Sequence, residues 1–423
     1  MSKLVHKLHV IIRDESLRAR ILFVCGALVI FRLLAVIPIP GIDILTLEQF
    51  FANYEFLGLL NVFSGGGLAN LSIVMLGVGP YITATIVMQV LTMMVPSLKA
   101  LYHEEGEAGR KKFIQYSRLL TVPLAFIQSF SFLTLLSSQG IVAHASGFDL
   151  LTNVLVISAG SILLMWIGEL MSEFGIGNGV SLIIFAGIVA GIPAMIGQQL
   201  FVFEIAQLPL YLGFIIFALL VIACVVWITE AERPIPINYA RQIRGNKMYG
   251  GVSTYLPLRL NQAGVIPIIF ALSLLLFPQM ILNFVASLPF ETISNIAQFA
   301  LDLLTNGWVY AGIYFFLVFV FTYFYTAVTF DPDTIAKNLH ESGAFVPGVR
   351  PGNATSEYIA KILTRITLVG ALFLGFIAVL PLAMQAYTGN TSLAIGGTAL
   401  LIVVSVVLDL AKKIDAQVSM REY

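Results

Sequence analysis

The apolar stretches of this 423-residue chain hold almost no side chains that could do chemistry. All five histidines fall in predicted loops, at His6, His9, His103, His144 and His340. The acids nearest to the apolar stretches fall at their ends, at Glu169, Glu173, Glu230 and Asp409. Proton relays, ion coordination and acid/base catalysis in a membrane all require ionisable groups at depth. The sequence therefore disfavours an ion-coupled transporter and an intramembrane enzyme, and we expect neither a cofactor nor a metal site.

Nucleotide chemistry is equally poorly supported. The chain contains no GxxxxGK[ST] motif, so it has no P-loop of its own. The glycine-rich run at 175–179, GIGNG, follows a predicted helix rather than a strand and lacks the spacing of a dinucleotide fingerprint. We expect it to form a tight turn and a helix start between two membrane spans. Any ATP that drives this protein must be hydrolysed by a partner.

Arg32 is the one cation within an apolar stretch. An arginine near the middle of a membrane helix costs about 2.5 to 3.5 kcal/mol on insertion scales. We expect its guanidinium to face a polar interior or carbonyl oxygens rather than lipid. A structural role is favoured over a functional one, and the sequence alone does not exclude either.

The positions of the remaining lysines and arginines predict the number and orientation of the membrane spans. They fall into five groups, within residues 3–20, 99–118, 233–259, 337–365 and 412–421. Positively charged loops stay on the cytoplasmic face, so each stretch between two groups crosses the membrane an even number of times. With roughly 20 residues per crossing, these lengths predict ten spans with both termini in the cytoplasm. The spans are expected near 21–39, 71–94, 117–137, 150–170, 178–197, 208–228, 262–284, 307–328, 362–382 and 393–411.

Composition agrees with a multi-span membrane protein. Hydrophobic residues make up 58% of the chain and charged residues 11%, with a mean hydropathy of +0.93. These values lie far from those of soluble domains. Net charge is zero because 23 basic residues balance 23 acidic ones.

Several shorter segments have more than one interpretation. Residues 1–20 suit either an amphipathic helix on the cytoplasmic surface or a charged flank that only fixes topology. The apolar run at 56–63 is too short to cross and precedes a triple glycine, so it is either a re-entrant element or an external loop. Two cytoplasmic loops, 229–261 and 329–361, are long and rich in glycine, proline and arginine. Long loops usually carry functions, so a large cytoplasmic partner is expected.

Several unusual strings resemble one known family. They are IPIPGID at 37–43, GVGPYITATIVMQVLT at 77–92, EEGEAGRKKFIQYSR at 104–118, MWIGELMSEFGIGNGVSLIIFAGIVAGIP at 165–193, YGGVSTYLPLRLNQAGVIPIIF at 249–270 and SGAFVPGVRPG at 342–352. In order and over nearly the whole chain, they resemble the SecY family of protein-translocase channel subunits. The resemblance implies an all-α membrane fold, with two inverted five-helix halves at 21–198 and 199–411 around an hourglass pore. A tail at 412–423 follows.

The resemblance also implies a ring of aliphatic side chains that seals the pore. In this chain the ring falls at Val78, Ile82, Val180, Ile184, Ile269 and Ile402. Two of its pairs are spaced i, i+4, which places both members on one helix face. Such a ring can exclude water at rest and still form no hydrogen bond with a passing chain. Aliphatic residues at this spacing more often belong to ordinary core packing. The interpretation of these residues as a pore ring therefore depends on the family resemblance.

Three further sites follow from the same resemblance. A plug beneath the ring is expected at about 56–70, with Phe56, Leu60, Asn61, Phe63, Ser64, Gly65, Gly66, Gly67 and Asn70. A lateral gate between helices two and three and helices seven and eight is expected to have Thr83, Gln128 and Asn261 as polar contacts across it, although such contacts are also ordinary interhelical bonds. Docking of the ATPase SecA or the ribosome is assigned to Arg350, Arg241, Arg244 and Lys247, which as loop charges could equally serve topology alone.

The expected role is a protein-conducting channel in the bacterial inner membrane. It would pass unfolded secretory polypeptides outward and release hydrophobic helices into lipid, and it would not be an enzyme. The expected partners are SecE, SecG, SecA, the ribosome, signal sequences, nascent polypeptides and the lipid bilayer, with no nucleic-acid site beyond ribosome docking. The rival is a solute transporter with a broken-helix site at the midplane. It would need ion-coupling groups, and the spans offer none beyond Arg32.

Overall fold

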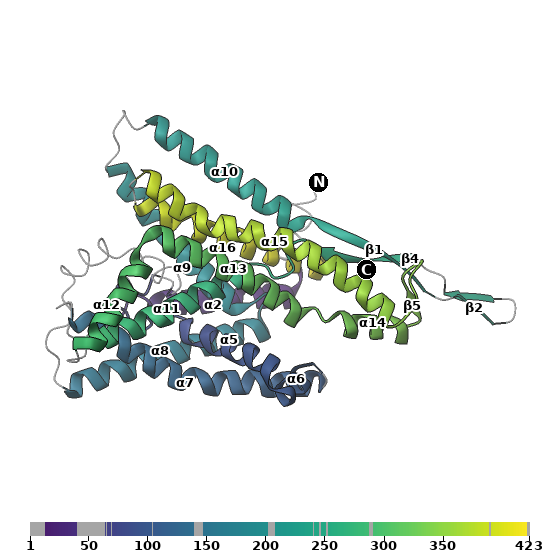
Figure 1. Cartoon of the computed structure of the whole chain (residues 1–423), viewed down its shortest axis with the longest axis horizontal. Helices are drawn as coiled ribbons and strands as arrows, with labels where there is room; N and C mark the ends of the chain where they lie inside the picture. Colours follow the sequence, from purple (N-terminus) through teal and green to yellow (C-terminus); the bar gives the residue numbers. More distant parts are fainter. Residues whose placement is uncertain are drawn as a thin grey trace.

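The computed structural model describes residues 13–39, 64, 66–68, 70–103, 105–138, 147–201, 208–239, 241–244, 247–250, 253–286, 291–388 and 391–420. Most of these residues are helical, and each of the ten predicted spans overlaps one long helix. These helices are α2 Glu15–Leu34, α5 Gly79–Met94, α7 Gly106–Ser138, α8 Gly147–Phe174, α9 Gly179–Phe201, α10 Leu208–Glu230, α11 Ile266–Ala286, α13 Gly307–Thr329, α15 Asn353–Thr388 and α16 Thr391–Ser419. They run along the long axis of the molecule as a bundle (Figure 1).

Three shorter helices complete the helical part. They are α6 Pro96–His103, α12 Glu291–Thr305 and α14 Pro332–Glu341. The axes of α5 and α6 differ by 114° across the break at Val95. By length and composition alone, three of the described helices could cross a membrane, or up to four if this bent pair counts as one span. The other spans are therefore recognised by the fold and by charge distribution rather than by length.

Some helices extend past the predicted span ends, whereas others, such as α5, which begins at Gly79 rather than near 71, are shorter. α7 begins at Gly106 rather than near 117, α15 at Asn353 rather than near 362, and α16 continues to Ser419 rather than 411. Hydropathy marks only the part of a helix that lies in lipid, whereas the hydrogen-bonded helix continues into water. At these ends the helices therefore continue into segments that carry basic residues, such as Lys111, Lys361 and Lys412.

The membrane-facing surface is apolar on the helices that lie at the rim. On α10, the exposed side chains include Leu212, Ile215, Ile216, Leu219 and Leu220. A helix that is hydrophobic all round is buried in a protein or in lipid. Because α10 packs against α16 along one side, we assign its remaining faces to lipid or to another membrane helix.

The two long loops, 229–261 and 329–361, contain strands, which the sequence analysis did not predict. β1 Glu232–Tyr239 pairs antiparallel with β4 Ser253–Arg259, and β5 Ala344–Phe345 adds to the other edge of β1. A second hairpin, β2 Arg241–Arg244 with β3 Lys247–Gly250, extends from the first and projects from one end of the bundle (Figure 1). In the described residues the fold is thus mostly helical, with its strands confined to the loops.

The sequence analysis did not predict β1 because this segment contains two prolines. Pro234 and Pro236 lack the N–H that a ladder requires, so proline is confined to strand edges or irregular positions. β4 pairs with β1 at both prolines, but β5 pairs with β1 only at Asn238 and Tyr239. Among the described strands, the edge of β1 opposite β4 is therefore unpaired at the two prolines. The intervening Ile235 and Ile237 are both buried, which gives the strand its alternating pattern.

Close packing in the first half of the chain depends on Gly160 of α8. A Cβ built there would overlap the carbonyl oxygen of Ile73. One residue further along, Ser161 Oγ donates to the Gly77 carbonyl at 2.8 Å. The segment that leads into α5 therefore lies directly against α8.

Replacing Gly160 with alanine should destabilise this half of the bundle. Backbone cannot yield as a flexible side chain does, so we expect a loss of about 1 to 3 kcal/mol or more. The thermal unfolding midpoint of the purified protein, followed by tryptophan fluorescence, should fall. Gly213→Ala on α10 is the matched control because nothing lies within 4 Å of a Cβ built there. Equal midpoints for both variants would contradict the close approach.

Candidate functional site

The six predicted ring residues come from four helices and meet in one hydrophobic cluster. Val78 is the N-cap of α5 and Ile82 lies on its first turn. Ile184 lies on α9, Ile269 on α11 and Ile402 on α16, and all five side chains are at most 7% exposed. Val180 is partly buried and packs against the same cluster. α5 contacts α11, and α9 contacts α16, so the four helices surround a common apolar centre.

The glycine-rich run at 175–179 starts α9 and so positions Val180 and Ile184. Gly177 has a φ of +95°, and the side chain of Asn178 accepts a hydrogen bond from the N–H of Ser181 at 3.2 Å. A Cβ on Gly179 would overlap the carbonyl oxygen of Gly168 in α8. The predicted tight turn and helix start are confirmed, and only glycine permits this close approach.

The described part of the plug segment is fixed to the end of α2. Asn70 Nδ2 donates to the Ala35 carbonyl at 3.3 Å, and the N–H of Ile39 donates to the Leu71 carbonyl at 2.9 Å. Leu68 is fully buried in a second cluster that includes residues of α7 and α8. Of the predicted plug residues, Ser64, Gly66, Gly67 and Asn70 are described. Phe56, Leu60, Asn61, Phe63 and Gly65 lie outside the described residues.

This segment also adjoins the ring. A Cβ on Gly67 would lie 3.0 Å from the Val74 carbonyl oxygen, and Val74 belongs to the cluster that holds Val78 and Ile82. Ser64 is buried, and its Oγ accepts a hydrogen bond from the N–H of Leu68 at 2.9 Å. Between this segment and α5, the chain contributes Leu68, Leu71 and Met75 to the second cluster and Val74 and Val78 to the cluster that holds the ring residues.

The predicted gate residues are only partly brought together. Gln128 Nε2 donates to Thr83 Oγ1 at 3.4 Å, which joins α7 to α5. Both helices belong to the same side of the predicted gate, so this bond strengthens one wall instead of bridging the seam. Another polar contact, from Arg118 Nε to Glu169 at 2.7 Å, ties α7 to α8. The predicted seam would lie where α11 packs against α5 and α7.

Asn261 does not share in this contact. It precedes α11 in the link from β4 and is 5% exposed. Its Oδ1 has no described hydrogen bond, and its side chain lines a cavity with residues of α9, α10 and α16. Because it lies before the helix starts, it is held at the end of the bundle that carries the sheet. The structure thus joins Gln128 to Thr83 but not to Asn261, and the place of Asn261 at the gate stays a prediction.

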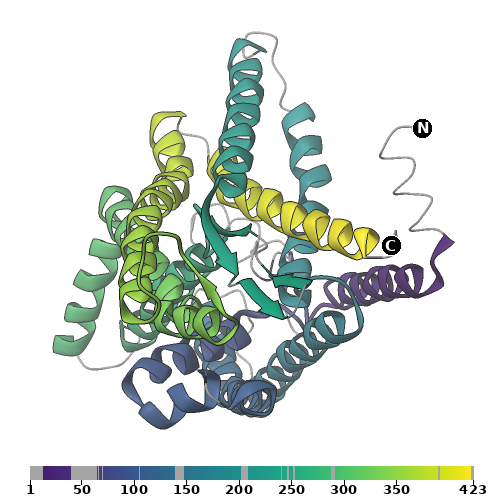
Figure 2. The same ribbon diagram turned by 90° about the vertical axis from the view of Figure 1, so that its right-hand side faces the viewer.

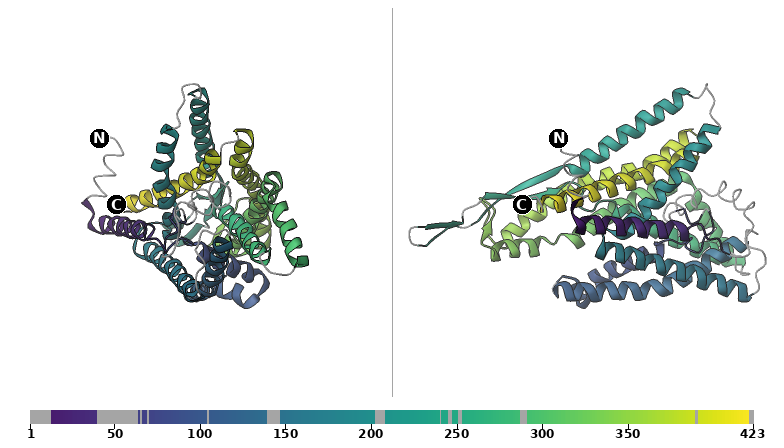
Figure 3. Two further views of the ribbon diagram at one scale, coloured as in Figure 1. Left: turned by 90° about the vertical axis from the view of Figure 1, so that its left-hand side faces the viewer. Right: turned by 180° about the vertical axis from the view of Figure 1, so that it is seen from behind.

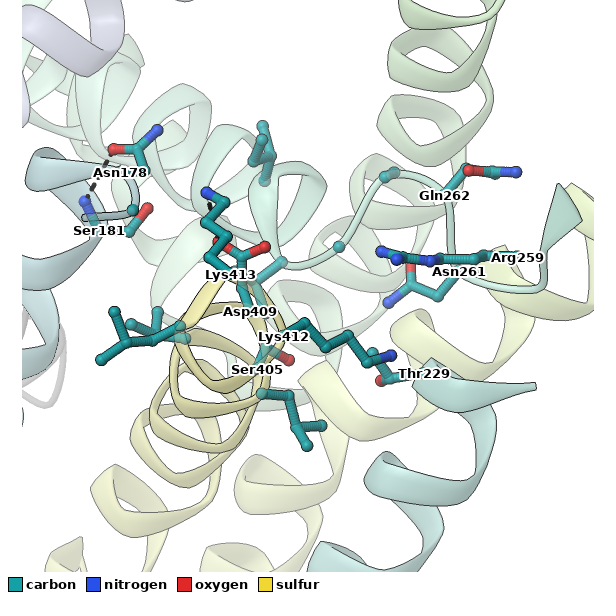
Figure 4. A pocket seen from close by; sticks show the side chains of 18 of the residues that line it. Asn178, Ser181, Thr229, Arg259, Asn261, Gln262, Ser405, Asp409, Lys412 and Lys413 are labelled. Carbon is teal, nitrogen blue, oxygen red and sulfur yellow. Dashed lines mark hydrogen bonds and ion pairs between the residues drawn. The ribbon is translucent and has the colours of Figure 1, made fainter. Parts of the chain in front are cut away.

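This cavity was missed by the sequence analysis. It has a volume of about 270 Å³ and is lined by polar groups from distant parts of the chain (Figure 4). The labelled lining residues are Asn178, Ser181, Thr229, Arg259, Asn261, Gln262, Ser405, Asp409, Lys412 and Lys413. Its apolar floor includes members of the ring's cluster, such as Leu182 and Val406. This polar cavity, which we call the vestibule, thus lies directly against the hydrophobic cluster that holds the ring residues.

The predicted docking residues lie on strands and links at one end of the bundle, which we call the platform: Arg350 adjoins the three-stranded sheet, and the other three lie on the separate β2–β3 hairpin. Arg350 is exposed in the link from β5 to α15, next to turns at Gly348 and Gly352 with φ of +82° and +98°. Thr355 Oγ1 donates to the Arg350 carbonyl at 2.9 Å and fixes this link to α15. Arg241, Arg244 and Lys247 lie on β2 and β3, where Arg244 pairs with Lys247 in register.

Pairing of β1 with β5 joins the two loops. A cluster beneath the sheet contains Ile235 and Leu258 from the first loop and Val346 and Ile359 from the second loop and α15. Viewed from the end of the molecule, this platform faces outward over the centre of the bundle (Figure 2). The two long loops are therefore joined by one three-stranded sheet, and their docking role stays a prediction.

Comparison with known proteins gives the family. The SecY family model matches residues 72–411. The protein translocase subunit SecY of Mycobacterium bovis is 41% identical over 435 residues, covering 97% of each chain. This chain belongs to the SecY family. The SecY subunit of Streptomyces scabiei is 39% identical with the same coverage.

Solved structures support the same fold. A protein-conducting channel structure aligns with a TM-score of 0.66 at 19% identity, covering 95% of this chain and 92% of that one. Sec61 in a canine ribosome-channel complex aligns with a TM-score of 0.63 at 18% identity over 95% of this chain and 92% of that one. The expected multi-span helical membrane fold of the SecY family is confirmed. The individual site residues stay predictions.

Proposed function

We propose that this chain is the channel-forming subunit of a bacterial protein translocase. It passes unfolded secretory polypeptides across the inner membrane and releases hydrophobic helices sideways into lipid. The full-length similarity to curated translocase subunits, at 41% identity over 97% of the chain, carries this proposal. The chain is a channel and not an enzyme, so the work of transport is done by a partner or by the membrane potential.

The conduction path in this proposal has three parts in series. A polypeptide enters through the polar vestibule, passes the aliphatic ring and displaces the plug segment on the far side. The burial of the ring residues in one cluster, drawn from helices of both halves, supports this order. Aliphatic constrictions can exclude water and ions while closed. The two halves, 21–198 and 199–411, would form the two sides of the pore as inverted repeats.

The expected partners divide between the platform and the membrane. The ribosome or SecA would dock on the platform formed by β1 to β5, and the ribosome-bound relatives support a ribosomal partner. SecE and SecG would contact the bundle within the membrane. Signal sequences would open the seam where α11 meets α5 and α7.

Both termini are placed in the cytoplasm in this proposal. The positive-inside rule puts the basic loops there, and these loops form the sheet. The start of α2 and the end of α16 lie toward the same end of the bundle as the sheet, which supports this orientation (Figure 3).

A stalled translocation intermediate tests the conduction path directly. With Cys25 and Cys224 replaced by serine, single cysteines at Ile82, Ile184 and Ile402 should each form disulfides with a cysteine in the stalled polypeptide. The matched control is Leu163→Cys on α8, which is 45% exposed on the bundle surface. Adducts should appear at the three ring positions and be absent at the control. An adduct at Leu163 with none at the ring would overturn the proposed path.

A further inference from the structure

The helix α12 has three different sides, and one of them packs against the bundle. Ala297 is 2% exposed, and Leu301 and Leu304 are partly buried. The spacing of these residues, i, i+4 and i+7, places them on the same side of the helix. Because α12 contacts both α11 and α13, this side of α12 faces the bundle.

A second side of α12 is apolar and exposed. Ile296, Phe299 and Leu303 are 66%, 71% and 46% exposed. Their spacing is i, i+3 and i+7, so they form one stripe along the helix. Single exposed apolar side chains are ordinary on a protein surface, but three in a row mark an interaction surface. We call these three residues the apolar stripe.

The third side of α12 is polar. Asn295, Gln298 and Asp302 are exposed and repeat the same spacing one residue earlier. Successive residues are about 100° apart around a helix, so this polar stripe runs beside the apolar one. α12 contains no lysine or arginine. A helix with an apolar and a polar face side by side suits the boundary between lipid and water.

The position of α12 in the chain agrees with such a boundary. It lies at the end of the bundle opposite the sheet (Figure 1). Ser294 Oγ donates a hydrogen bond to the carbonyl oxygen of Ala286, the last residue of α11, at 2.8 Å. At its other end, α12 stops at Thr305 and α13 starts at Gly307. α12 therefore lies where the chain leaves one membrane helix and enters the next.

The surface of α13 continues the apolar surface toward the membrane interior. Trp308, the second residue of α13, is 78% exposed, and Phe316, about two turns further along, is 64% exposed. The helix that begins at Gly307 is long and apolar enough to cross a membrane. Tryptophan is enriched at membrane interfaces. The lipid-facing surface of α13 thus begins next to the end of α12.

We propose that the apolar stripe of α12 docks onto the bilayer surface. Phe299 lies at the boundary between headgroups and acyl chains, and the polar stripe faces water. Because α12 carries no cation, the contact is made by apolar insertion and needs no anionic lipid. The inference depends on the membrane fold of the family and not on the channel function.

Fluorescence quenching of a single tryptophan tests the docking. Trp166, Trp227 and Trp308 are 61%, 76% and 78% exposed, so phenylalanine can replace all three without disturbing the core. Phe299→Trp is then added, and the full chain is reconstituted with its translocase subunits in phosphatidylcholine nanodiscs, which leave both membrane surfaces open to solvent.

Lipids brominated near the glycerol end of the acyl chain should quench Phe299→Trp. Lipids brominated at the chain terminus should quench it less, by about twofold or more, because an interfacial helix is buried only about 5 to 10 Å deep. Aqueous iodide should quench it weakly. Gln298→Trp is the matched control, since Gln298 is the adjacent residue on the polar stripe. It should show the opposite pattern, with strong quenching by iodide and weak quenching by lipid.

Three results would overturn the proposal. Quenching of Phe299→Trp by iodide instead of lipid would place the stripe in water. Quenching by neither would show that another subunit covers it. Equal quenching of both variants by lipid would show that the helix is immersed and has no polar side in water.

A nitroxide spin label gives a second measurement that requires no new tryptophan. With Cys25 and Cys224 replaced by serine, the label is attached to Leu303→Cys or, as the control, to Asn295→Cys. Oxygen concentrates in lipid and a nickel chelate stays in water. The label on the apolar stripe should therefore collide more often with oxygen, and the label on the polar stripe with the chelate. The same collision ratio at both positions would contradict docking on lipid.

Discussion

Deletion of residues 58–68 should convert a silent channel into one that leaks ions. The deletion removes Leu68, whose buried side chain packs in the cluster with Phe132 and Leu133. It also removes Gly67, which lies against the backbone that leads to Val78. Without this segment, only a single layer of aliphatic side chains would separate the vestibule from the outside. A constriction of that kind blocks ions only while it stays dewetted.

The measurement is ion conductance of the reconstituted protein in planar bilayers without a substrate. We expect the time-averaged current to rise by about tenfold or more over wild type, because intermittent wetting of the ring is no longer blocked. Deleting residues 241–250, which removes the β2–β3 hairpin, is a control of similar length. It should leave the resting current unchanged because the hairpin projects from the platform, away from the ring (Figure 1).

Continued silence of the plug deletion would count heavily against the channel function. A leak in both deletions would be less informative about the plug itself, and it would contradict the placement of the hairpin outside the pore. The two variants together therefore test function and geometry.

Reversing the charge of Arg350 should abolish transport driven by the ATPase SecA. Arg350 is exposed, and its link is held by the Thr355 hydroxyl and by two glycine turns. An ordered, exposed arginine is suited to pair with an acidic group on a partner. Removing one partner of a buried charge pair at an interface weakens binding by about 2 to 5 kcal/mol. Arg350→Glu also adds repulsion between the new carboxylate and the acidic group of the partner.

Translocation of a secretory precursor into vesicles, with SecA and ATP added, measures this effect. We expect transport by Arg350→Glu to fall below detection, while signal-sequence insertion and the resting conductance stay close to wild type. Lys337→Glu is the matched control, since it reverses an exposed charge on neighbouring α14. Normal transport by Arg350→Glu would remove Arg350 from the docking surface. Equal loss in both variants would show that net loop charge matters rather than this residue.

Charge distribution and length predicted the membrane part of the fold well. The spacing of basic groups gave ten spans, and each overlaps a long helix such as α8 or α13. The number of spans could be predicted because the positive-inside rule depends on the positions of Lys and Arg in the sequence and not on tertiary contacts. The family motifs predicted the pore ring; its buried positions belong to one large hydrophobic cluster, and their role as a ring stays a prediction.

Features that depend on pairing between distant segments could not be predicted. β1 pairs with β5 over a separation of about one hundred residues, and only the folded chain brings Asn238 beside Phe345. The vestibule is another case, because Thr229, Asn261 and Asp409 are scattered in the sequence and each is an ordinary polar residue in its own context. Asn261 was expected at the gate from the family resemblance, and the sequence did not show that it would also line this cavity.

The three-stranded sheet has a mechanical consequence. Its outer strands belong to two loops, and these loops connect directly to α10, α11 and α15. A load applied at the tip of the platform is therefore shared by these helices instead of bending one loop. α11 is also the helix that packs against α5 and α7. The sheet thus couples three helices of the bundle, and through α11 this coupling extends to the contact with α5 and α7.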